Sequence, residues 1–456
     1  MVEVYIVLDI GKTNIKLTAL DEGAGVLAEA RCANAAVNLP PYRQHDVERI
    51  WHWLLETLRA WAGRFDVRAI VPVTHGATAA LVGACDHDLA LPVLDYEAEL
   101  PEAGYQAVRP PFANTCSPAL PAGLNLGRQL HWQQQAHADG FQRARHILLY
   151  PQYWAWRLSG VAASELTSLG CHTDLWQPHA RAYSSLVSAM GWEPLMPPLH
   201  SAGAVLGVLL PELARQTGIR ADCRIICGIH DSNASLLRHL DGGRKTVLST
   251  GTWVIAAAIN APPQTLNESL DMLANVSAYG TPVSCMRFMG GREFSVLTGA
   301  EQQVCKVADL VHIIARGTLA TPCFAAIGGP FAGQQGRLLG PQPRTAPERY
   351  ALATLYCALM TDYCLAQMDP DAPVVVEGSF TANPYFAAVL AALRPGRHVT
   401  VSDDASGTTS GGWMLATGKP LPAAPELRPA SALHLPGLAA YARHWRDICC
   451  APHATL

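Results

Sequence analysis

The sequence predicts an α/β protein built from two similar halves, each based on a mixed sheet flanked by helices. Two observations lead to this prediction. Apolar, strand-like runs alternate with helical patterns along most of the chain, an order typical of partly parallel sheets. Each half also begins in the same way, with an apolar strand, a turn of glycine and hydroxyl residues, and a second apolar strand, first at residues 4–20 and again at 246–259.

The composition is that of a well-packed globular protein. Half of the 456 residues are hydrophobic and only 15% are charged, and this length allows two or three domains. A net charge of −4 gives no electrostatic footprint for nucleic acid or an anionic membrane, and no apolar run is long enough for a membrane helix. The chain begins with a strand pattern instead of a signal peptide, so we expect a cytoplasmic protein. Its thirteen cysteines are scattered without a paired CxxC framework, which indicates buried thiols.

The first half opens with three predicted strands, at residues 4–8, 15–20 and 26–31, joined by tight turns as in a hairpin. Asp9 ends the first strand, and the turn that follows consists of Ile10, Gly11, Lys12, Thr13 and Asn14. Backbone N–H groups and hydroxyls in such a turn can bind an anion. An ordinary hairpin turn has the same composition, so the motif leaves both interpretations open.

Polar residues follow the next two predicted strands. After an amphipathic helix at 46–65, which Asp46 caps, a strand at 67–73 leads to His75 and Gly76. A strand at 92–94 leads to Asp95 and Tyr96. Open α/β sheets bind ligands beyond the carboxyl ends of their strands, so these residues are candidates for substrate contacts. A histidine that is simply hydrogen-bonded within a loop would give the same pattern.

The stretch from residue 225 to 235 carries the best candidate for a catalytic group. An apolar run ends in Gly228, and the adjacent His230 and Asp231 precede a small-residue segment that predicts a helix. A lone carboxylate between a strand end and a helix start is suited to act as a general base. The pattern then breaks at residues 241–243, so we expect a first domain at 1–240 and a second at 241–456.

The second half repeats the strand–turn–strand opening, with Thr250, Gly251 and Thr252 in the turn. A further turn at Gly378 and Ser379 follows a buried strand. The remaining predicted elements are helices at 347–368, 384–393 and 408–417 and strands at 374–376 and 399–402. The Pro- and Ala-rich tail beyond residue 420 suggests a surface wrap.

These motifs together suit phosphoryl transfer. The two turns of glycine and hydroxyl residues, one in each half, offer donors to phosphates, and the turn at Gly378 can hold the nucleoside end. Asp9 can bind Mg²⁺ directly or through water. Asp231 can accept the proton of an attacking hydroxyl, since phosphoryl transfer depends mainly on positioning and charge stabilisation.

The chain resembles the FGGY carbohydrate kinases, within the actin/hexokinase/Hsp70-type ATPase superfamily. The matching segments are 9–14, 228–231, 249–252, 378–383 and 408–416, in the family's order. The resemblance implies an actin-like/ribonuclease H-like two-domain ATPase fold, with duplicated mixed sheets and a central cleft. It assigns sugar binding, the first phosphate loop and the catalytic aspartate to 1–240, and nucleotide binding to 241–456.

The resemblance also implies a role for each matched residue. Asp231 is the catalytic base, and His230, His75, Gly76, Asp95 and Tyr96 contact the sugar. The residues that match ATP-binding positions are Gly11, Lys12, Thr13, Asn14, Lys16, Thr250, Gly251, Thr252, Gly378, Ser379 and Asn383. Asp9 matches the position that holds Mg²⁺.

Within the family the chain looks most like the rhamnulokinase and fuculokinase branch, because of His230 beside Asp231 and Trp253 after the second phosphate turn. The resemblance therefore implies an ATP- and Mg²⁺-dependent kinase of a small ketose, such as L-rhamnulose, L-fuculose or a ketopentose. We expect a sugar as the partner, no nucleic acid and no membrane, and we consider a homodimer as the assembly. The family usually carries a second glycine where Glu377 stands, and often a tryptophan where His75 stands. An ATPase of another class on the same fold, and a non-catalytic sugar sensor, remain as alternatives.

Overall fold

The computed structural model describes residues 1–456 except 84–87, 102–103, 302, 326–327, 425 and 451–456. The chain divides into two compact units. The first comprises Met1–Asp241, Ala274–Pro282 and Ser406–Ala424, and the second comprises Gly242–Leu273, Val283–Ala405 and Pro425–Leu456. The first unit thus contains two segments from the second half of the sequence, which the sequence did not predict.

The first unit contains a mixed sheet, further short strands and helices. Its elements are β1 (Val2–Ile10), β2 (Asn14–Leu20), β3 (Val26–Ala33), β4 (Ala36–Leu39), β5 (Tyr42–His45), α1 (Val47–Ala62), β6 (Phe65–Thr74), β7 (Ala79–Val82), β8 (Leu89–Leu91), α2 (Tyr105–Val108), α3 (Phe112–Thr115), α4 (Leu126–Ala136), α5 (Ala138–Gln142), β9 (His146–Leu149), α6 (Tyr150–Ser159), β10 (Ser164–Glu165), α7 (Leu166–Leu169), β11 (Trp176–Gln177), β12 (Ala182–Tyr183), α8 (Ser185–Ala189), β13 (Leu199–His200), β14 (Val205–Val208), α9 (Pro211–Thr217), β15 (Arg224–Ile226), β16 (Ile229–His230), α10 (Asp231–Leu240) and α15 (Gly407–Thr417).

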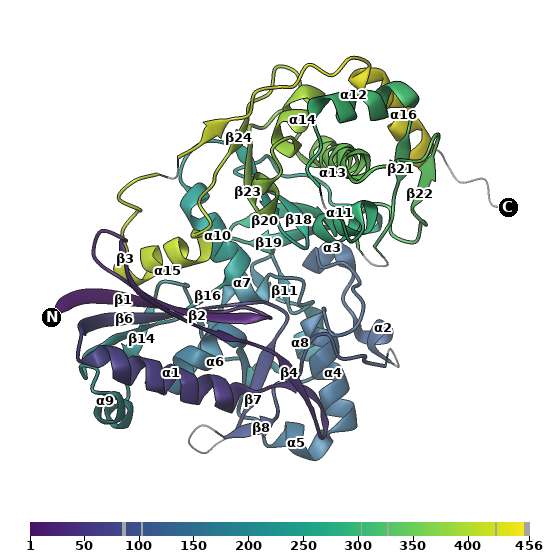
Figure 1. The fold of residues 1–456 in the computed structure, drawn as a ribbon. Coiled ribbons are helices and arrows are strands. Elements are labelled where there is room, and N and C mark those ends of the chain that lie inside the picture. The colour runs from purple at the N-terminus through teal and green to yellow at the C-terminus, as the bar shows by residue number, and fades with distance from the viewer. Residues whose placement is uncertain (84–87, 102–103, 302, 326–327, 425, 451–456) are drawn as a thin grey trace. The chain divides into compact units, whose positions relative to one another are not determined.

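The main sheet of the first unit runs in the order β14-β15-β6-β1-β2-β3, with β16 also paired to β6. Strands β1, β15 and β16 are parallel to β6, whereas β1, β2 and β3 pair antiparallel as the predicted hairpin. Residues on β1 alternate between the two faces of the sheet. Ile6 and Leu8 lie in the apolar cluster with α1, and Val7 lies in the cluster with Trp413 of α15. Helices α1 and α15 accordingly cover opposite faces of this sheet (Figure 1).

Helix α1 forms where the sequence predicted it. Its apolar residues recur every three or four positions and are buried, while the side chains on its other face are exposed. Asp46 caps it, because its carboxylate accepts a hydrogen bond from the backbone N–H of Arg49 at 3.1 Å. The burial of Trp51 and Trp61 on this helix agrees with a core role for both tryptophans.

The second unit is also built on a mixed sheet. The elements that follow α10, apart from α15, are β17 (Lys245–Thr250), β18 (Val254–Ile259), β19 (Met272–Val276), β20 (Pro282–Phe288), α11 (Gly290–Thr298), α12 (Val307–Arg316), β21 (Leu319–Thr321), β22 (Arg337–Leu339), α13 (Ala346–Met368), β23 (Val374–Gly378), α14 (Phe386–Leu393), β24 (Val399–Val401), β25 (Arg428–Pro429) and α16 (Leu438–Cys450). The last three residues of β19 and the first of β20 fall in the segment Ala274–Pro282 of the first unit. The sheet order is β19-β20-β18-β17-β23-β24-β25.

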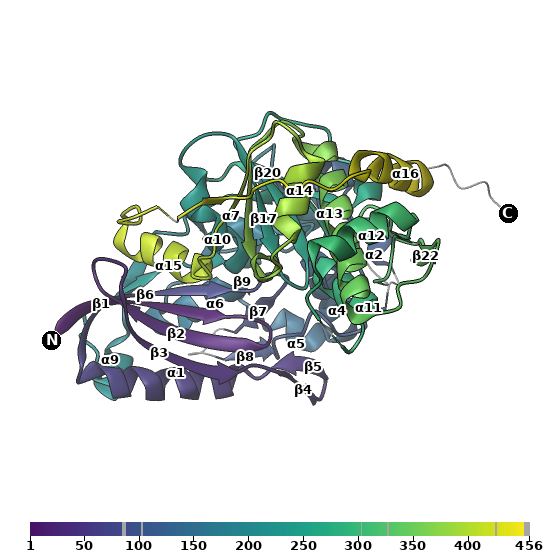
Figure 2. The same cartoon turned by 45° about the horizontal axis from the view of Figure 1, so that its top comes forward.

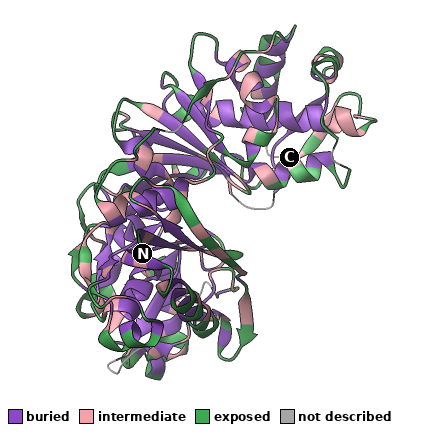
Figure 3. Ribbon diagram, turned by 60° about the vertical axis from the view of Figure 1, so that its left-hand side comes forward, coloured by how far each residue is buried: buried purple, intermediate pink, exposed green. Residues whose placement is uncertain are grey.

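The two sheets repeat one arrangement. In the first, a hairpin of β1 and β2 continues into β3, and β6 runs parallel to β1. In the second, a hairpin of β17 and β18 continues into β20, and β23 runs parallel to β17. The duplicated architecture predicted from the two strand–turn–strand openings is therefore present. Figure 3 shows the central strands of both sheets buried along most of their length, whereas no residue of the outer strand β3 is buried.

The core of the second unit is centred on α13, which is buried along almost its whole length. Helices α12, α14 and α16 lie around it in Figure 2. The expectation that the tail beyond residue 420 wraps the surface is wrong for its last part. Helix α16 places Tyr441 and Trp445 in this core, and Trp445 is only 1% exposed. Its apolar residues at three- and four-residue spacing are a helix signal that the Pro- and Ala-rich composition before it obscured.

The strand predicted at residues 92–94 is also not formed. Strand β8 ends at Leu91, and Leu94 makes only an isolated bridge with Gln44. Pro92 explains this, because proline has no N–H to continue the ladder. No disulfide joins the described cysteines, and among them only Cys32 and Cys450 are not buried. Within the same described part of the chain, no helix is both long and apolar enough to cross a membrane.

Candidate active site

The carboxyl ends of three strands in the first unit bring the principal candidate residues together. Strands β1 and β16 both run parallel to β6, with Ile10 and His230 each opposite Thr74. The residues at or just beyond these ends, Asp9, His75 and Asp231, therefore lie at one edge of the sheet. Electrostatic interaction of Asp231 with both of the others reflects this proximity.

Asp231 is the first residue of α10 and is partly accessible, with 28% of its side chain exposed. Its Oδ1 accepts a hydrogen bond from the backbone N–H of Ser232 at 2.5 Å. Its Oδ2 makes no hydrogen bond to any described residue. Burial of the carboxyl group raises its pKa, and the neighbouring His75 and the N–H of Ser232 lower it in part. The side chain thus has a free oxygen and raised basicity, as a general base requires.

The imidazoles of His230 and His75 lie near this carboxylate, and that of His45 lies against His75. Burial lowers the pKa of His230 to about 4 and of His45 to about 3, and it also lowers the pKa of His75. The rings of His45 and His75 lie 5.1 Å apart. Nε2 of His75 is buried and has no hydrogen-bond partner among the described residues. A buried ring nitrogen without a partner is suited to a polar group of a ligand.

Two glycines allow the loops that carry these residues to pack closely against each other. A Cβ at Gly76 would lie 2.9 Å from Nε2 of His230, so only glycine lets the two loops meet. Gly228 has φ of +90°, and a Cβ there would lie 2.5 Å from the carbonyl oxygen of Pro72. Asn233 contacts the other ring nitrogen of His230 at 3.1 Å and fixes the ring. His230 is thereby held 3.2 Å from Oδ1 of Asp231.

Asp95 is the centre of a second cluster next to the histidines. Its side chain is fully buried and forms ion pairs with Lys12 and with Arg43, whose Nε lies 2.5 Å away. Burial pushes the pKa of Asp95 upward, but the hydrogen bond and charge of Lys12 outweigh it and hold the pKa below its ordinary value. Lys12 also lies 4.4 Å from the ring centre of Tyr96, which contacts His75 edge-on at 5.5 Å.

This cluster changes which group Lys12 is expected to contact. The sequence grouped Lys12 with the phosphate-binding turn, but its side chain points to Asp95 and Tyr96, which the sequence grouped with the sugar. Lys16 behaves differently, because its Nζ lies 3.8 Å from Asp9 and donates to Thr409 at 2.8 Å. The two lysines of the first hairpin therefore serve different groups.

The first turn itself is fixed by hydrogen bonds within it and to Asn34. The backbone N–H of Gly11 donates to the carbonyl of Asn14 at 2.9 Å, and Thr13 and Asn14 are exposed. Asn34 holds the turn from β3's side, since its amide donates to the carbonyl of Gly11 at 2.8 Å. The backbone N–H of Asn34 donates to the carbonyl of Thr13 at the same distance. The hydroxyl of Thr13 is left at the surface of a fixed turn.

The candidate nucleotide residues lie together in the second unit. Strands β17 and β23 are parallel, with Thr250 opposite Gly378, so the two predicted turns leave the same edge of the sheet. The hydroxyl of Thr250 donates to the carbonyl of Glu377 and accepts from the N–H of Phe380 at 3.0 Å. Thr250 therefore clamps the two strand ends together. The exposed hydroxyl in this turn is that of Thr252.

Gly378, Ser379 and Asn383 form the second of these turns. Gly378 has φ of +86° and ψ of −156°, a conformation that is essentially restricted to glycine. A Cβ there would lie 2.1 Å from the carbonyl oxygen of Thr250. Ser379 is exposed, whereas Asn383 donates to Thr354 at 2.9 Å and accepts from the N–H of Tyr385 at 3.0 Å. Asn383 thus stabilises the start of α14.

The residues around Asp9 fit a magnesium ion. Among the described residues, no group of three or more His, Cys, Asp or Glu side chains could hold a metal. Mg²⁺ usually keeps several waters and takes only one or two carboxylates, so it needs no such cage. Asp9 is 17% exposed, and its Oδ1 makes no hydrogen bond within the described chain, while Oδ2 accepts from Thr408 at 2.8 Å. One carboxylate oxygen is thus available to a hydrated cation.

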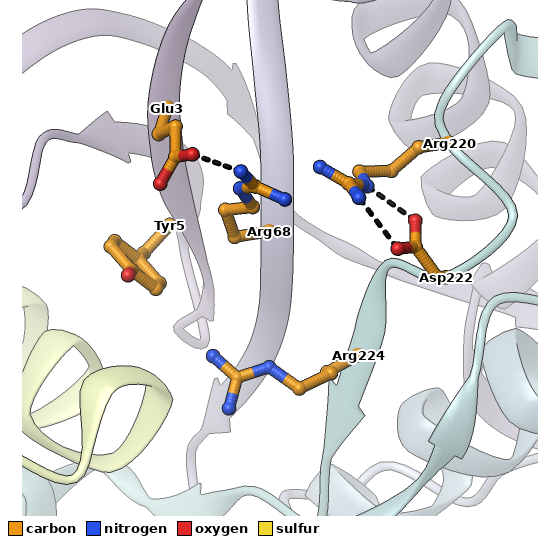
Figure 4. Close-up of a pocket in the computed structure, with 6 residues that line it drawn as sticks. All are labelled: Glu3, Tyr5, Arg68, Arg220, Asp222 and Arg224. Carbon is orange, nitrogen blue, oxygen red and sulfur yellow. Dashed lines mark hydrogen bonds and ion pairs between the residues drawn. The ribbon is translucent and has the colours of Figure 1, made fainter.

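A separate cavity of about 290 Å³ lies on the same sheet, near the start of β1, and contains none of these residues. Figure 4 shows its lining, in which Glu3 pairs with Arg68 and Asp222 pairs with Arg220. The remaining arginine, Arg224, donates to the carbonyl of Ala416 at the end of α15 at 3.2 Å. All three arginines that line this cavity are thus paired with groups of the protein itself.

Comparison with known proteins identifies the family. The model of the N-terminal domain of the FGGY family of carbohydrate kinases matches residues 106–237, and the model of the FGGY C-terminal domain matches residues 242–425. The crystal structure of a carbohydrate kinase from Novosphingobium aromaticivorans has a TM-score of 0.91 and 37% identity, covering 99% of each chain. The chain belongs to the FGGY family of carbohydrate kinases.

Other FGGY proteins share less of the sequence. A ligand-bound xylulose kinase from Lactobacillus acidophilus has a TM-score of 0.82 at 15% identity, covering 100% of this chain and 99% of its own, which shows the fold alone. The L-fuculokinase of Salmonella typhi is 28% identical over 265 residues, and a rhamnulokinase of Halalkalibacterium halodurans is 25% identical over 150. The first match covers 56% of each chain and the second covers 32% of each. The chain therefore spans about half the length of the L-fuculokinase that it matches.

These comparisons confirm the FGGY membership and the two-domain actin-like/ribonuclease H-like fold that the sequence predicted. The structure adds residues to the candidate site that the sequence analysis missed. Arg43 and His45 lie against Asp95, Asn34 holds the first turn, and Thr408 and Thr409 contact Asp9 and Lys16. Only the two threonines carried a signal, as part of a small-residue helix, and nothing in the sequence connected them with residues 399 and 393 positions earlier.

Proposed function

We propose that the protein is an ATP- and Mg²⁺-dependent kinase that phosphorylates a hydroxyl of a small ketose. The observation that carries this proposal is the environment of Asp231. Its carboxylate is partly exposed, has raised basicity and a free Oδ2, and stands beside a ring nitrogen of His75 that lacks a partner. A base that takes the proton of a sugar hydroxyl needs these properties.

The residues of the first unit can be given roles in the transfer. Asp231 accepts the proton as the sugar oxygen attacks the terminal phosphate of ATP, and the oxygen–phosphorus bond to ADP breaks. Lys16 and the exposed turn of Thr13 and Asn14 offer donors to the transferring phosphate. Such donors stabilise the charge that spreads over the phosphate oxygens. His230 restrains Asp231 through its contact at 3.2 Å.

Asp9 is the residue that we assign to Mg²⁺, through water or directly. When bound, the ion neutralises charge on the transferring phosphates. In the second unit, Gly251 and Thr252 are assigned to the phosphates of ATP, and Gly378 and Ser379 to its nucleoside end. Thr250 and Asn383 support these turns from within, since their polar groups bind the backbone or Thr354.

The sugar site suits a neutral substrate. The imidazoles of His45, His75 and His230 are neutral at physiological pH, because burial lowers the pKa of each. The charges of Lys12 and Arg43 are balanced by Asp95 and by Glu97, whose carboxylate lies 3.4 Å from each cation. A ketose that offers only hydroxyls and a carbonyl fits this balance, and the names of the relatives, L-fuculokinase, rhamnulokinase and xylulose kinase, support that class.

The decisive experiment is an ADP-release assay over ketoses, aldoses and polyols with wild-type protein and Asp231→Asn. We expect ADP release that depends on a ketose, and a loss of turnover of at least about a hundredfold in the variant, the usual scale for a missing general base. Calorimetry should find ATP binding unchanged in the variant. Asp222→Asn removes an exposed aspartate of the same unit and serves as the matched control.

Other outcomes would support the alternatives. Equal ADP release with and without sugar would favour an ATPase of another class on this fold. Binding of ATP and a sugar without any ADP release would favour a sensor. Near wild-type turnover of Asp231→Asn would contradict the role of Asp231 as the base.

A further inference from the structure

We propose that Thr408 and Thr409, in the first turn of α15, are positioning residues that keep Asp9 and Lys16 apart, so that the carboxylate and the ammonium stay available to the metal and the phosphates. This inference rests on the proposed function. It concerns residues of the first unit only, since Ser406–Ala424 belongs to that unit.

The distances around Asp9 and Lys16 carry the argument. Nζ of Lys16 lies 3.8 Å from Oδ2 of Asp9, which is longer than the roughly 2.7–2.9 Å of a direct charge-assisted hydrogen bond. Each group instead has a hydroxyl as its close partner. Thr408 donates to Oδ2 of Asp9 at 2.8 Å, and Lys16 donates to the hydroxyl of Thr409 at 2.8 Å.

A direct contact between the two charged groups would make Asp9 less able to bind a cation and Lys16 less able to bind a phosphate. Opposite charges in a partly buried site attract strongly, and only 17% of Asp9 and 20% of Lys16 are exposed. A collapsed pair would leave Asp9 neutralised toward a cation and Lys16 neutralised toward a phosphate. The two hydroxyls satisfy one oxygen and one proton of the pair without carrying charge, so they keep its members separate.

The hydroxyls of Thr408 and Thr409 do not make the hydrogen bond that is usual for a threonine in a helix. A helical threonine commonly donates to the carbonyl four residues earlier, as Thr417 of the same helix does to Trp413 at 2.9 Å. Thr408 and Thr409 instead reach across to β1 and β2, which come some 400 residues earlier in the chain. Their partners are the two charged groups themselves.

Close packing fixes the helix that carries them. A Cβ at Gly411 would lie 2.1 Å from the carbonyl oxygen of Ala234, and one at Gly412 would lie 2.7 Å from Val7. Trp413 donates from its ring to the carbonyl of Asp21 at 2.8 Å. At the other end of the helix, Arg224 holds the carbonyl of Ala416. Helix α15 is therefore seated directly on α10 and β1, and its first turn has little freedom to move.

The test compares valine with serine at each position, because valine keeps the shape of threonine and serine keeps the hydroxyl. Thr408→Val should raise the Mg²⁺ concentration for half-maximal rate about tenfold, and Thr409→Val should raise the KM for ATP about tenfold, as expected for one lost hydrogen bond to a charged group. The KM for the sugar should stay unchanged. Thr408→Ser and Thr409→Ser should restore wild-type values, and Thr417→Val is the control on the same helix.

A measurement without turnover completes the test. Calorimetry of ATP with and without Mg²⁺, in the absence of sugar, should find the gain from Mg²⁺ reduced in Thr408→Val and kept in Thr408→Ser. Wild-type Mg²⁺ dependence in Thr408→Val would overturn the inference, and so would serine variants as impaired as the valine variants. A wild-type protein that phosphorylates no sugar would overturn the proposed function itself, whereas active wild type with unaffected valine variants would overturn this inference alone.

Discussion

At Asp231, the conditions for a general base come from the fold around a single carboxylate. Burial raises its pKa, and the hydrogen bond from Ser232 occupies only Oδ1. The imidazoles nearby stay neutral, because burial lowers the pKa of each. The neutral rings can offer or accept hydrogen bonds to a sugar, whereas a protonated His75 would weaken the base by lowering the pKa of Asp231.

The pKa of Asp231 leads to a prediction for pH dependence. The base works when ionised, so kcat/KM should be full above the raised pKa of Asp231 and fall as pH decreases through it. An ordinary aspartate has a pKa of about 3.9, so the acid limb should lie at a higher pH than that value. Rate profiles at saturating ATP test this. An acid limb at or below the ordinary aspartate value would show that burial does not control the base.

Lys12 gives a second prediction at the residue scale. Its ion pair with Asp95 and its contact with the Tyr96 ring tie it to the sugar cluster. Lys12→Met should raise the KM for the sugar about tenfold, the loss expected when one partner of a charged hydrogen bond is removed, and leave the KM for ATP unchanged. Lys419→Met removes an exposed lysine paired with Glu22 and is the control. A larger increase in the KM for ATP than in the KM for the sugar would show that Lys12 binds the phosphates instead.

At the scale of elements, the ends of parallel strands place the site. Strands β1, β6 and β16 end side by side in the first unit, and β17 and β23 do so in the second. Adjacent parallel strands point their carboxyl ends the same way, so loops far apart in sequence leave from one edge. The turn at Gly378 is the tightest of these junctions.

Gly378→Ala should weaken the second unit and its binding of ATP. The new Cβ meets the Thr250 carbonyl at 2.1 Å, and the backbone conformation is one that alanine avoids, so we expect a loss of about 3 kcal/mol in unfolding free energy. Gly396 also has a positive φ, of +77°, but no atom lies near its Cβ position. Gly396→Ala should therefore cost only the backbone strain, about 1 kcal/mol. Chemical denaturation compares the two, and equal losses would argue against the clash.

At the scale of the whole molecule, the segment Ser406–Ala424 belongs to the first unit although it follows most of the second unit in the sequence. Helix α15 covers an apolar face made by Val7, Val73 and Ile226, to which it adds Trp413 and Ala416. A fragment that ends at residue 241 lacks this cover. The unit is therefore complete only when residues from near the end of the chain are present.

This leads to a prediction about fragments. The fragment 1–241 should bind a hydrophobic dye and unfold without a cooperative transition, because its sheet exposes apolar surface. The same fragment with 406–424 attached by a flexible linker should bind less dye and unfold more cooperatively. Trp413→Ala in the linked fragment is the control, since it removes the largest side chain of the cover. A fragment 1–241 that folds cooperatively by itself would contradict this account.

Much of the local structure could be predicted because its signals are local. The hairpin of β1 and β2, the amphipathic α1 with its Asp46 cap, and α13 all follow from apolar spacing and capping residues. The prediction failed where a composition bias hid a periodic pattern, as in α16, or where one proline ended a strand, as at Pro92. The roles assigned to the site residues stay predictions.

The sequence by itself determined the two strand–turn–strand openings, the position of Asp231 between a strand and a helix, and the family. Those features depend on residues close together in the chain, where spacing and conformational preference are enough. Only the tertiary structure decided that Lys12 faces Asp95, that Thr250 clamps two strand ends, and that α15 brings hydroxyls to Asp9 and Lys16. These contacts join residues from tens to hundreds of positions apart, and such pairings depend on how sheets and helices pack, which no local pattern in the sequence records.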